Sequence, residues 1–324
     1  MNARRHVAVL GSAIVAVIVV CAIERPINAQ TLGEPPAEGA LEVLKVQGNV
    51  WMIAGGGANI AVQAGEQGLV VVDTGASGMS DKVIAAIRGI SNRPVRYIIN
   101  TSAAPQHVGG NAALGSLPGG STAPGAIGGA NPNVIAHENV YVRMTAVGGD
   151  RQSVFLTSAW PTDGYFAPRR KLIFNGEAID IIHMPSAVSD GDSVVYFRGS
   201  NVLVTGDIFT TTNLPLVDRV HGGTYAGSLA ALRSLLDMAV PDDLMEGGTY
   251  IVPGHGRICD DADLVEFHDM AYEIRDRVAK LVAQGKTLEQ IKAARPVLGW
   301  EGRYSRPQWS ADAFIEAIYT EFRR

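Results

Sequence analysis

The sequence predicts an α/β protein built from two packed sheets with helices on the outside. Two strand-rich stretches, near residues 41–100 and 134–252, each carry helical patterns, which suits that layered arrangement. Glycine makes up 37 of the 324 residues, so many tight turns are expected. The charged fraction is only 18%, which favours long apolar strands in a globular chain.

The first half reads as a meander followed by a helix and a further strand. A helix is predicted over 80–90, where Val83, Ile84 and Ile87 fall on one face. Glycine-rich turns at 55–57 and 65–68 separate the earlier strands. The predicted strands are 41–46, 50–54, 59–63, 69–72 and 95–100.

The second half begins with residues 112–132, whose Gly, Ala, Pro and Ser content predicts a mobile surface loop. Strands follow near 134, 172–174, 178–182, 193–197, 202–205 and 249–252, with a helix over 225–238.

The C-terminal part is predicted to be helical. Thr287 and Gln290 resemble a capping box that opens a second C-terminal helix, and Gly285 ends the first. One face of that first helix is apolar through Leu264, Phe267, Ala271, Ile274, Val278 and Leu281. We therefore expect one domain over 41–258 and a helical extension, 259–324, packed on the same domain.

The N-terminus has the layout of a secretory signal peptide over residues 1–29. Arg4 and Arg5 precede an apolar run from Val7 to Ile23, and Ala29 marks the expected cut. The alternative is an uncleaved membrane anchor, because the run is at the lower edge of a spanning length. Cys21 is a weak candidate for lipid attachment. We expect export to the periplasm or beyond, a flexible lead-in over 30–40, and no stable membrane span once the leader is removed.

Composition excludes several classes of partner and site. The net charge is −5 and the chain has no long basic run, so nucleic acid is not an expected partner. Once Cys21 leaves with the leader, Cys259 stands alone, which excludes an intrachain disulfide and a Cys-rich zinc site. Cys259 is expected to be a small, partly buried residue.

Five segments in order carry a family resemblance: LVVVDTGAS (69–77), NTSAAPQHVGGN (100–111), SAVSDGDSVVYF (186–197), VLVTGDIF (202–209) and IVPGHG (251–256). Together they resemble the metallo-β-lactamase superfamily, whose signature reads Asn-Thr-His-x-His-x-Asp-His-x-Gly-Gly-Asn. The resemblance covers about residues 42 to 258. It implies a four-layer αββα sandwich, here with C-terminal helices, and a metal-dependent hydrolase of esters, thioesters or lactams.

The first metal site of the family is missing from this sequence. The resemblance places its three histidines at Ser102, Ala104 and Val188. Alanine and valine cannot bind a metal, and a neutral serine hydroxyl is a poor zinc ligand. A dinuclear zinc site is therefore not expected.

The second metal site is largely kept. The resemblance assigns it to Gln106, His107, Asp207 and His255, where Gln106 replaces an aspartate. Two imidazoles and one carboxylate can hold one zinc or iron ion, and a Gln106 carbonyl oxygen is a weaker candidate ligand. Gln106 cannot act as an acid or base.

The resemblance also implies structural roles in and before the signature loop. It assigns Asp73 to a position beneath the ligand loop, and Asn100, Gly109 and Gly110 to residues that give this loop its shape.

His107, Asp207 and His255, here called the trio, also have a plain structural interpretation. His107 can hydrogen-bond backbone at a helix start, Asp207 can cap or pair locally, and His255 lies between glycines in a tight loop. Their joint spacing is what favours a metal site.

The remaining polar candidates are interpreted as structural. His183 is expected to be a hydrogen-bonded residue in a sheet, and His137 and His268 to be surface or packing residues. Asp190 and Asp192 could replace a lost ligand only if their loop bent back, and turn chemistry explains them more simply.

Three functions remain open. The first is an exported hydrolase-like protein with one metal at His107, Asp207 and His255 and weak or altered hydrolysis. The second is a non-catalytic binding or scaffold protein that uses the same cleft. The third is a non-hydrolytic iron site of the two-histidine, one-carboxylate type. Each implies a small-molecule partner.

Overall fold

The computed structural model describes residues 40–119, 130–146, 155–304 and 309–323. The expected signal peptide and all but the last residue of the expected lead-in lie outside these residues. The strands are β1 (Glu42–Gln47), β2 (Val50–Ala54), β3 (Ile60–Gly65), β4 (Gly68–Val72), β5 (Val95–Ile99), β6 (Asn133–His137), β7 (Asp163–Tyr165), β8 (Arg169–Phe174), β9 (Glu177–His183), β10 (Ser193–Phe197), β11 (Val202–Gly206) and β12 (Tyr250–Pro253). The α-helices are α1 (Ser80–Ile90), α2 (Pro105–Val108), α3 (Asn111–Gly115), α4 (Glu138–Thr145), α5 (Tyr225–Met238), α6 (Asp261–Ala283), α7 (Leu288–Ala293), α8 (Glu301–Tyr304) and α9 (Ala311–Phe322).

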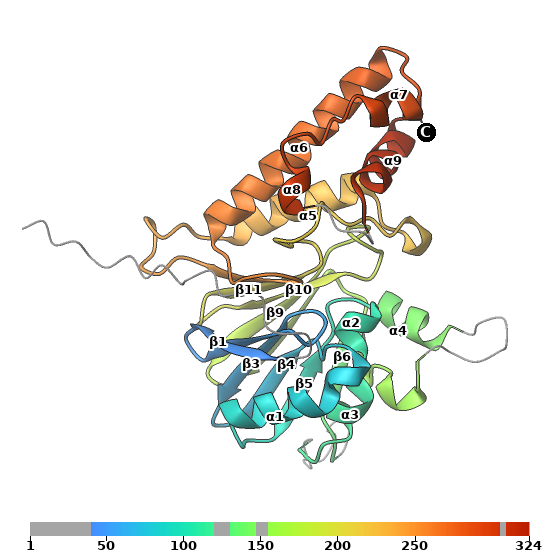
Figure 1. The fold of residues 1–324 in the computed structure, drawn as a ribbon. Coiled ribbons are helices and arrows are strands. Elements are labelled where there is room, and N and C mark those ends of the chain that lie inside the picture. The colour runs from blue at the N-terminus through green and yellow to red at the C-terminus, as the bar shows by residue number, and fades with distance from the viewer. Residues whose placement is uncertain (1–39, 120–129, 147–154, 305–308, 324) are drawn as a thin grey trace, which may run out of the picture. The chain divides into compact units, whose positions relative to one another are not determined.

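Two sheets form the centre of the domain (Figure 1). The first runs in the order β1 to β7, antiparallel as far as β4 and parallel from β4 to β7. The second runs β12-β11-β10-β9-β8, with β11 and β12 parallel and the other pairs antiparallel. The carboxyl ends of parallel neighbours meet at one edge of a sheet, so the loops after β4, β5 and β6 are neighbours, as are those after β11 and β12.

Three apolar clusters hold the layers together. Residues such as Val70 and Ile99 of the first sheet pack between the sheets against Val195 and Val204 of the second. Alternate residues of the first sheet, such as Val71, face α1 and α3 on its outer side. This alternation follows from the period of two along a strand. The second sheet buries its outer face under α5, α6 and α9 (Figure 1). The four-layer αββα arrangement expected from the sequence is confirmed.

The C-terminal helices begin at well-defined caps. Asp260 and Asp263 form a capping box that opens α6. The expected box between Thr287 and Gln290 opens α7. Gly285, whose φ of 74° suits glycine, follows the end of α6 as expected. Leu264, Phe267 and their apolar neighbours on α6 join the cluster over the second sheet, so these helices pack on the same body.

The structure corrects one expectation. The segment 112–132 is not loop throughout, because α3 covers Asn111–Gly115 and buries Leu114 beneath the first sheet. Residues 120–129 of that segment lie outside the described residues. The sequence also gave no sign of β7 or α4. Among the helices that the structure describes, none is long and apolar enough to cross a membrane.

Candidate metal centre

Three segments bring His107, Asp207 and His255 together at the edge where the parallel strands end. Asp207 follows β11 directly, and His255 comes two residues after β12. His107 lies on α2, the short helix that follows β5 and begins with Pro105. Proline suits the first turn of a helix, where its missing N–H would have no partner.

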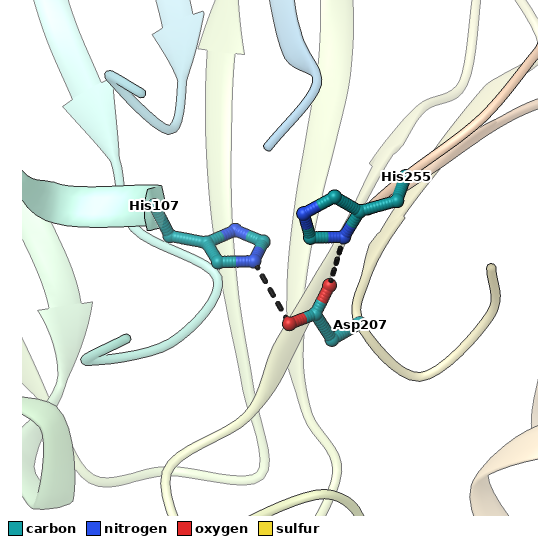
Figure 2. A group of neighbouring side chains, drawn as sticks. All are labelled: His107, Asp207 and His255. Atoms are coloured by element: carbon teal, nitrogen blue, oxygen red, sulfur yellow. Dashed lines mark hydrogen bonds and ion pairs between the residues drawn. The ribbon is translucent and has the colours of Figure 1, made fainter. Parts of the chain in front are cut away.

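The trio forms a compact group. His107 Nε2 lies 3.1 Å from Asp207 Oδ2, and His255 Nδ1 lies 2.9 Å from Asp207 Oδ1. Figure 2 shows both imidazoles pointing toward the Asp207 carboxyl group. His107 is fully buried and the His255 side chain is 27% exposed, so the group is open on the His255 side.

Asp73 fixes His107 from beneath the loop. Asp73 Oδ2 lies 2.7 Å from His107 Nδ1 and also accepts a 2.6 Å hydrogen bond from the Thr101 hydroxyl. The Thr101 backbone N–H donates to the other carboxyl oxygen of Asp73 at 2.8 Å. With Nδ1 directed at a carboxylate, His107 turns Nε2 toward Asp207, which is how a carboxylate orients a metal-binding imidazole.

The expected shape-giving residues also have clear contacts. Asn100 and Asn111 are buried and exchange side-chain hydrogen bonds of 3.1 and 2.8 Å. A Cβ on Gly109 would lie 2.4 Å from Ser77 N, and one on Gly110 would lie 2.4 Å from Thr74 O. Glycine is therefore required sterically at both positions.

Electrostatics in the trio are strongly coupled. Burial alone would lower the pKa of His107, but Asp207 and Asp73 outweigh burial and raise it well above the usual histidine value. Burial would raise the pKa of Asp207, but His107 and His255 hold it well below the usual range. His107, Asp73 and Asp207 therefore form a buried ionic network.

The residues fit a single metal ion. One ligand atom from each of His107, Asp207 and His255 lies within 4.8 Å of the other two. His107 Nε2 is a buried nitrogen without an in-line hydrogen-bond partner among the described residues, although Asp207 is close by. A buried polar atom left in this way suits a ligand atom. Gln106 donates its amide N–H toward Asp207 Oδ2 at 3.4 Å, so it points a donor, rather than its carbonyl oxygen, at the centre.

The positions that the resemblance assigns to the first metal site of the family all line one cavity. Ser102, Ala104 and Val188 line a cavity of about 610 Å³, and Asp207 is also among its lining residues. The structure therefore brings together both sets of positions that the sequence singled out. The first set lines the cavity, and the second set forms an ion-paired group.

Asp190 and Asp192 do not replace a lost ligand. Asp192 is buried and accepts hydrogen bonds from the Ser189 backbone N–H and hydroxyl, as expected for turn chemistry. Burial raises the pKa of Asp192 to about 7. Asp190 pairs with Arg143 on α4. Neither belongs to the group of described residues that can hold a metal.

His137, His183, His268 and Cys259 lie outside the trio. His183 Nε2 lies 2.8 Å from Asp190 O, and its ring stacks on His137 with centroids 3.7 Å apart. His137 is buried and caps α4. His268 sits on α6 beside Asp269, and Cys259 is buried and free. Sequence patterns gave no signal for the stacked pair, because residues 137 and 183 meet only through the fold.

Comparison with known proteins identifies the family. The family model described as the metallo-beta-lactamase superfamily matches residues 45–255. This chain belongs to the metallo-β-lactamase superfamily. Its members typically bind zinc. No curated protein matches the chain in sequence.

Solved structures of the superfamily share the fold. The stereoselective inverting sec-alkylsulfatase Pisa1 from Pseudomonas sp. matches with a TM-score of 0.62 and 14% identity, over 88% of this chain and 50% of that one. A double mutant of the same sulfatase matches with a TM-score of 0.66 and 14% identity, over 87% and 50%. A metallo-β-lactamase from Pontibacter korlensis matches with a TM-score of 0.54 and 16% identity, over 72% and 99%. The chain thus spans about half the length of the sulfatase structures, and at these identities the likeness concerns the fold alone.

Proposed function

We propose that this protein is an exported hydrolase of the metallo-β-lactamase fold that works with one metal ion and has weak or altered hydrolysis. The observation that carries the proposal is the group formed by His107, Asp207 and His255, with one ligand atom of each within 4.8 Å of the others. Esters, thioesters and lactams are the proposed substrate classes, because the superfamily and this ligand set suit attack of water on an acyl group.

Three residues would hold the ion. His107 would offer Nε2, since Nδ1 is engaged by Asp73, and Asp207 and His255 would complete the set. When bound, a zinc or iron ion supplies a Lewis acid that makes water more acidic.

The surrounding residues orient that set. Asp73 keeps the His107 ring in place, and Gln106 donates to Asp207 at 3.4 Å. Because Gln106 cannot exchange a proton near neutral pH, it positions the carboxylate and takes no part in acid–base steps.

Metal analysis tests the proposal. The protein is purified without chelator and without a histidine tag, and bound metals are quantified by mass spectrometry beside His255→Ala. His268→Ala is the matched control, because His268 lies on α6 outside the trio. We expect about one zinc or iron per chain in the parent and the control, and a drop of at least about tenfold in His255→Ala.

The identity of the metal and a substrate screen then separate the functions. Zinc with turnover of an ester, thioester or lactam supports the hydrolase. Iron without hydrolysis favours the non-hydrolytic iron site. Background metal in a folded parent protein would overturn the one-metal proposal.

A non-catalytic binding protein is the second candidate. The favouring observation is that Ser102, Ala104 and Val188 line an open cavity of about 610 Å³, which is the size of a small-molecule pocket. The metal-free outcome of the analysis above would support this candidate.

A further inference from the structure

The cavity beside the candidate metal centre is lined in part by the residues at the family's first-metal positions. Ser102, Ala104 and Val188 carry small or aliphatic side chains where the family has imidazoles, and all three line the cavity. Alanine and valine side chains offer no hydrogen-bond group. A ligand at this part of the lining therefore meets an apolar surface in place of a metal ion.

A second part of the lining, from α4 and the residues Ala146 and Phe155, is apolar as well. Val142 and Ala146 lie on and just after α4, and Phe155 follows in the chain. Val142 remains 57% exposed although it borders the cavity. An apolar group in the cavity would cover the exposed surface of Val142. Burial of apolar area is favourable at about 25 cal/mol per Å².

The charged groups of the cavity are already paired with one another. Arg143 forms an ion pair with Asp190 and donates to His221 O at 3.0 Å. His221 in turn pairs with Asp218. Both basic side chains that line the cavity, Arg143 and His221, therefore have carboxylate partners.

The balance of charge disfavours an anionic ligand group. The lining includes four carboxyl groups, those of Asp190, Asp192, Asp207 and Asp218, against the one guanidinium of Arg143 and the imidazole of His221. Arg143 already pairs with Asp190 and His221 with Asp218, so an anion would find no unpaired basic side chain among the described residues of the lining and would lose its hydration there.

We propose that this cavity binds the apolar part of an uncharged small molecule, with the residues that replace the first-metal histidines as its floor. The proposal deepens the proposed function by naming the ligand class, and it rests on that function only for the reaction of the bound molecule. Volume supports it, because about 610 Å³ lies within the range of small-molecule pockets.

Binding of a fluorescent probe tests the proposal without using activity. The purified protein is titrated with N-phenyl-1-naphthylamine, which is uncharged at neutral pH. Val188→Trp fills the floor, and Val265→Trp is the matched control because Val265 is an exposed residue of α6. We expect one saturable site, weakened at least about tenfold in Val188→Trp and within about twofold of the parent in Val265→Trp.

A second variant guards against misfolding of the first. Val142→Asp changes a residue that lines the cavity from α4. Because Val142 is exposed to solvent, the fold should tolerate a carboxylate there. We expect weaker probe binding with an unchanged circular dichroism spectrum. Probe binding at the parent strength in folded Val188→Trp and Val142→Asp would overturn the proposal.

Competition tests the charge of the ligand. The probe is displaced with 4-phenylbutanol and with 4-phenylbutyrate, which share a skeleton and differ in charge. We expect the alcohol to compete at least about tenfold better, because the carboxylate loses hydration beside other carboxylates. Equal or stronger competition by the carboxylate would overturn the assignment.

Repeating the titration after removal of metal by a chelator separates this proposal from the proposed function. Unchanged probe affinity is expected, since the apolar residues of the lining bind no metal and Asp207 is the one member of the trio among the lining residues. Affinity that disappears with the metal would show that the lining alone does not bind and would count against the proposal.

Discussion

The two sides of the candidate centre differ in chemistry, although the loop over residues 100–111 contributes residues to both. On the second-metal side, His107, Asp207 and His255 form a coupled ionic group. On the first-metal side, Ser102, Ala104 and Val188 leave a cavity. The residues that support the loop are kept, and they are absent from the lining of that cavity: Asp73, Asn100, Gly109 and Gly110. The loop is therefore supported by contacts that do not involve Ser102, Ala104 or Val188.

The largest difference between the sides should appear in stability. His107→Ala removes the partner of two buried carboxylates, those of Asp73 and Asp207. Breaking such a buried network typically costs about 3–5 kcal/mol. We expect a loss of that size in the free energy of unfolding, measured by denaturant titration, together with loss of bound metal.

The corresponding change on the first-metal side is Ser102→Ala. The Ser102 hydroxyl accepts only a 3.3 Å hydrogen bond from Ala104 N, so we expect a loss of no more than about 1 kcal/mol. Equal effects of the two variants would contradict the view that only the second-metal side remains an ionic centre.

Rebuilding the lost ligands is the next test. In the triple variant Ser102→His, Ala104→His and Val188→His, three imidazoles would face the cavity, and three protein ligands with an open position suit zinc. We expect the metal content to rise by about one equivalent per chain. Mass spectrometry of bound metal gives the count.

The matched control places asparagine at the same three positions, because its amide is polar but is a poorer zinc ligand than imidazole. An unchanged metal content in the histidine variant would mean that the backbone of the first-metal side no longer fits an ion.

The smallest expected effect is the change of stability with pH that His137 causes. His107 has a raised pKa, whereas burial and the neighbouring His183 lower the pKa of His137 to about 4 against the attraction of Asp190. Between pH 4 and about 6.5 the unfolded chain binds more protons at this residue than the folded chain does. The stability contributed by neutral His137 is therefore present above about pH 6.5 and is lost as the pH falls toward 4.

His137→Asn tests this sign, because asparagine retains an acceptor for capping α4. His183, Tyr165 and Asp190 face or contact the ring and stay in place. We expect the variant to lose less stability than the parent between pH 6.5 and 4, by less than about 1 kcal/mol in total because solvent screens part of the interaction. Unfolding free energies across this range provide the measurement, and parallel curves would refute the expectation.

Much of the fold could be predicted from local patterns. The bounds of α1 and α5 and of β2 and β10 agree with the sequence prediction, because apolar periodicity and flanking turn residues are clear there. β7 and α4 could not be predicted in this way. β7 has three residues, Asp163–Tyr165, and α4 buries only Val140 and Met144, so neither has enough periodic signal.

The centre was predictable through family spacing, and its surroundings were not. Residue order placed His107, Asp207 and His255 together, which the structure agrees with. The cavity is lined from α4, the segment after it and three distant loops, and the paired charges of Arg143 and Asp190 lie 47 residues apart in sequence. Such contacts depend on the tertiary fold and leave no short-range pattern.

The Asp73 contacts have a consequence for how this chain can change. Asp73 sits at the end of β4 with a φ of 62°, and from there it holds both Thr101 and His107. The anchor therefore lies on either side of residues 102–106 and outside them. Residues 102–106 are therefore suited to randomisation in directed evolution, because the contacts of Asp73 with Thr101 and His107 continue to attach the loop to the sheet.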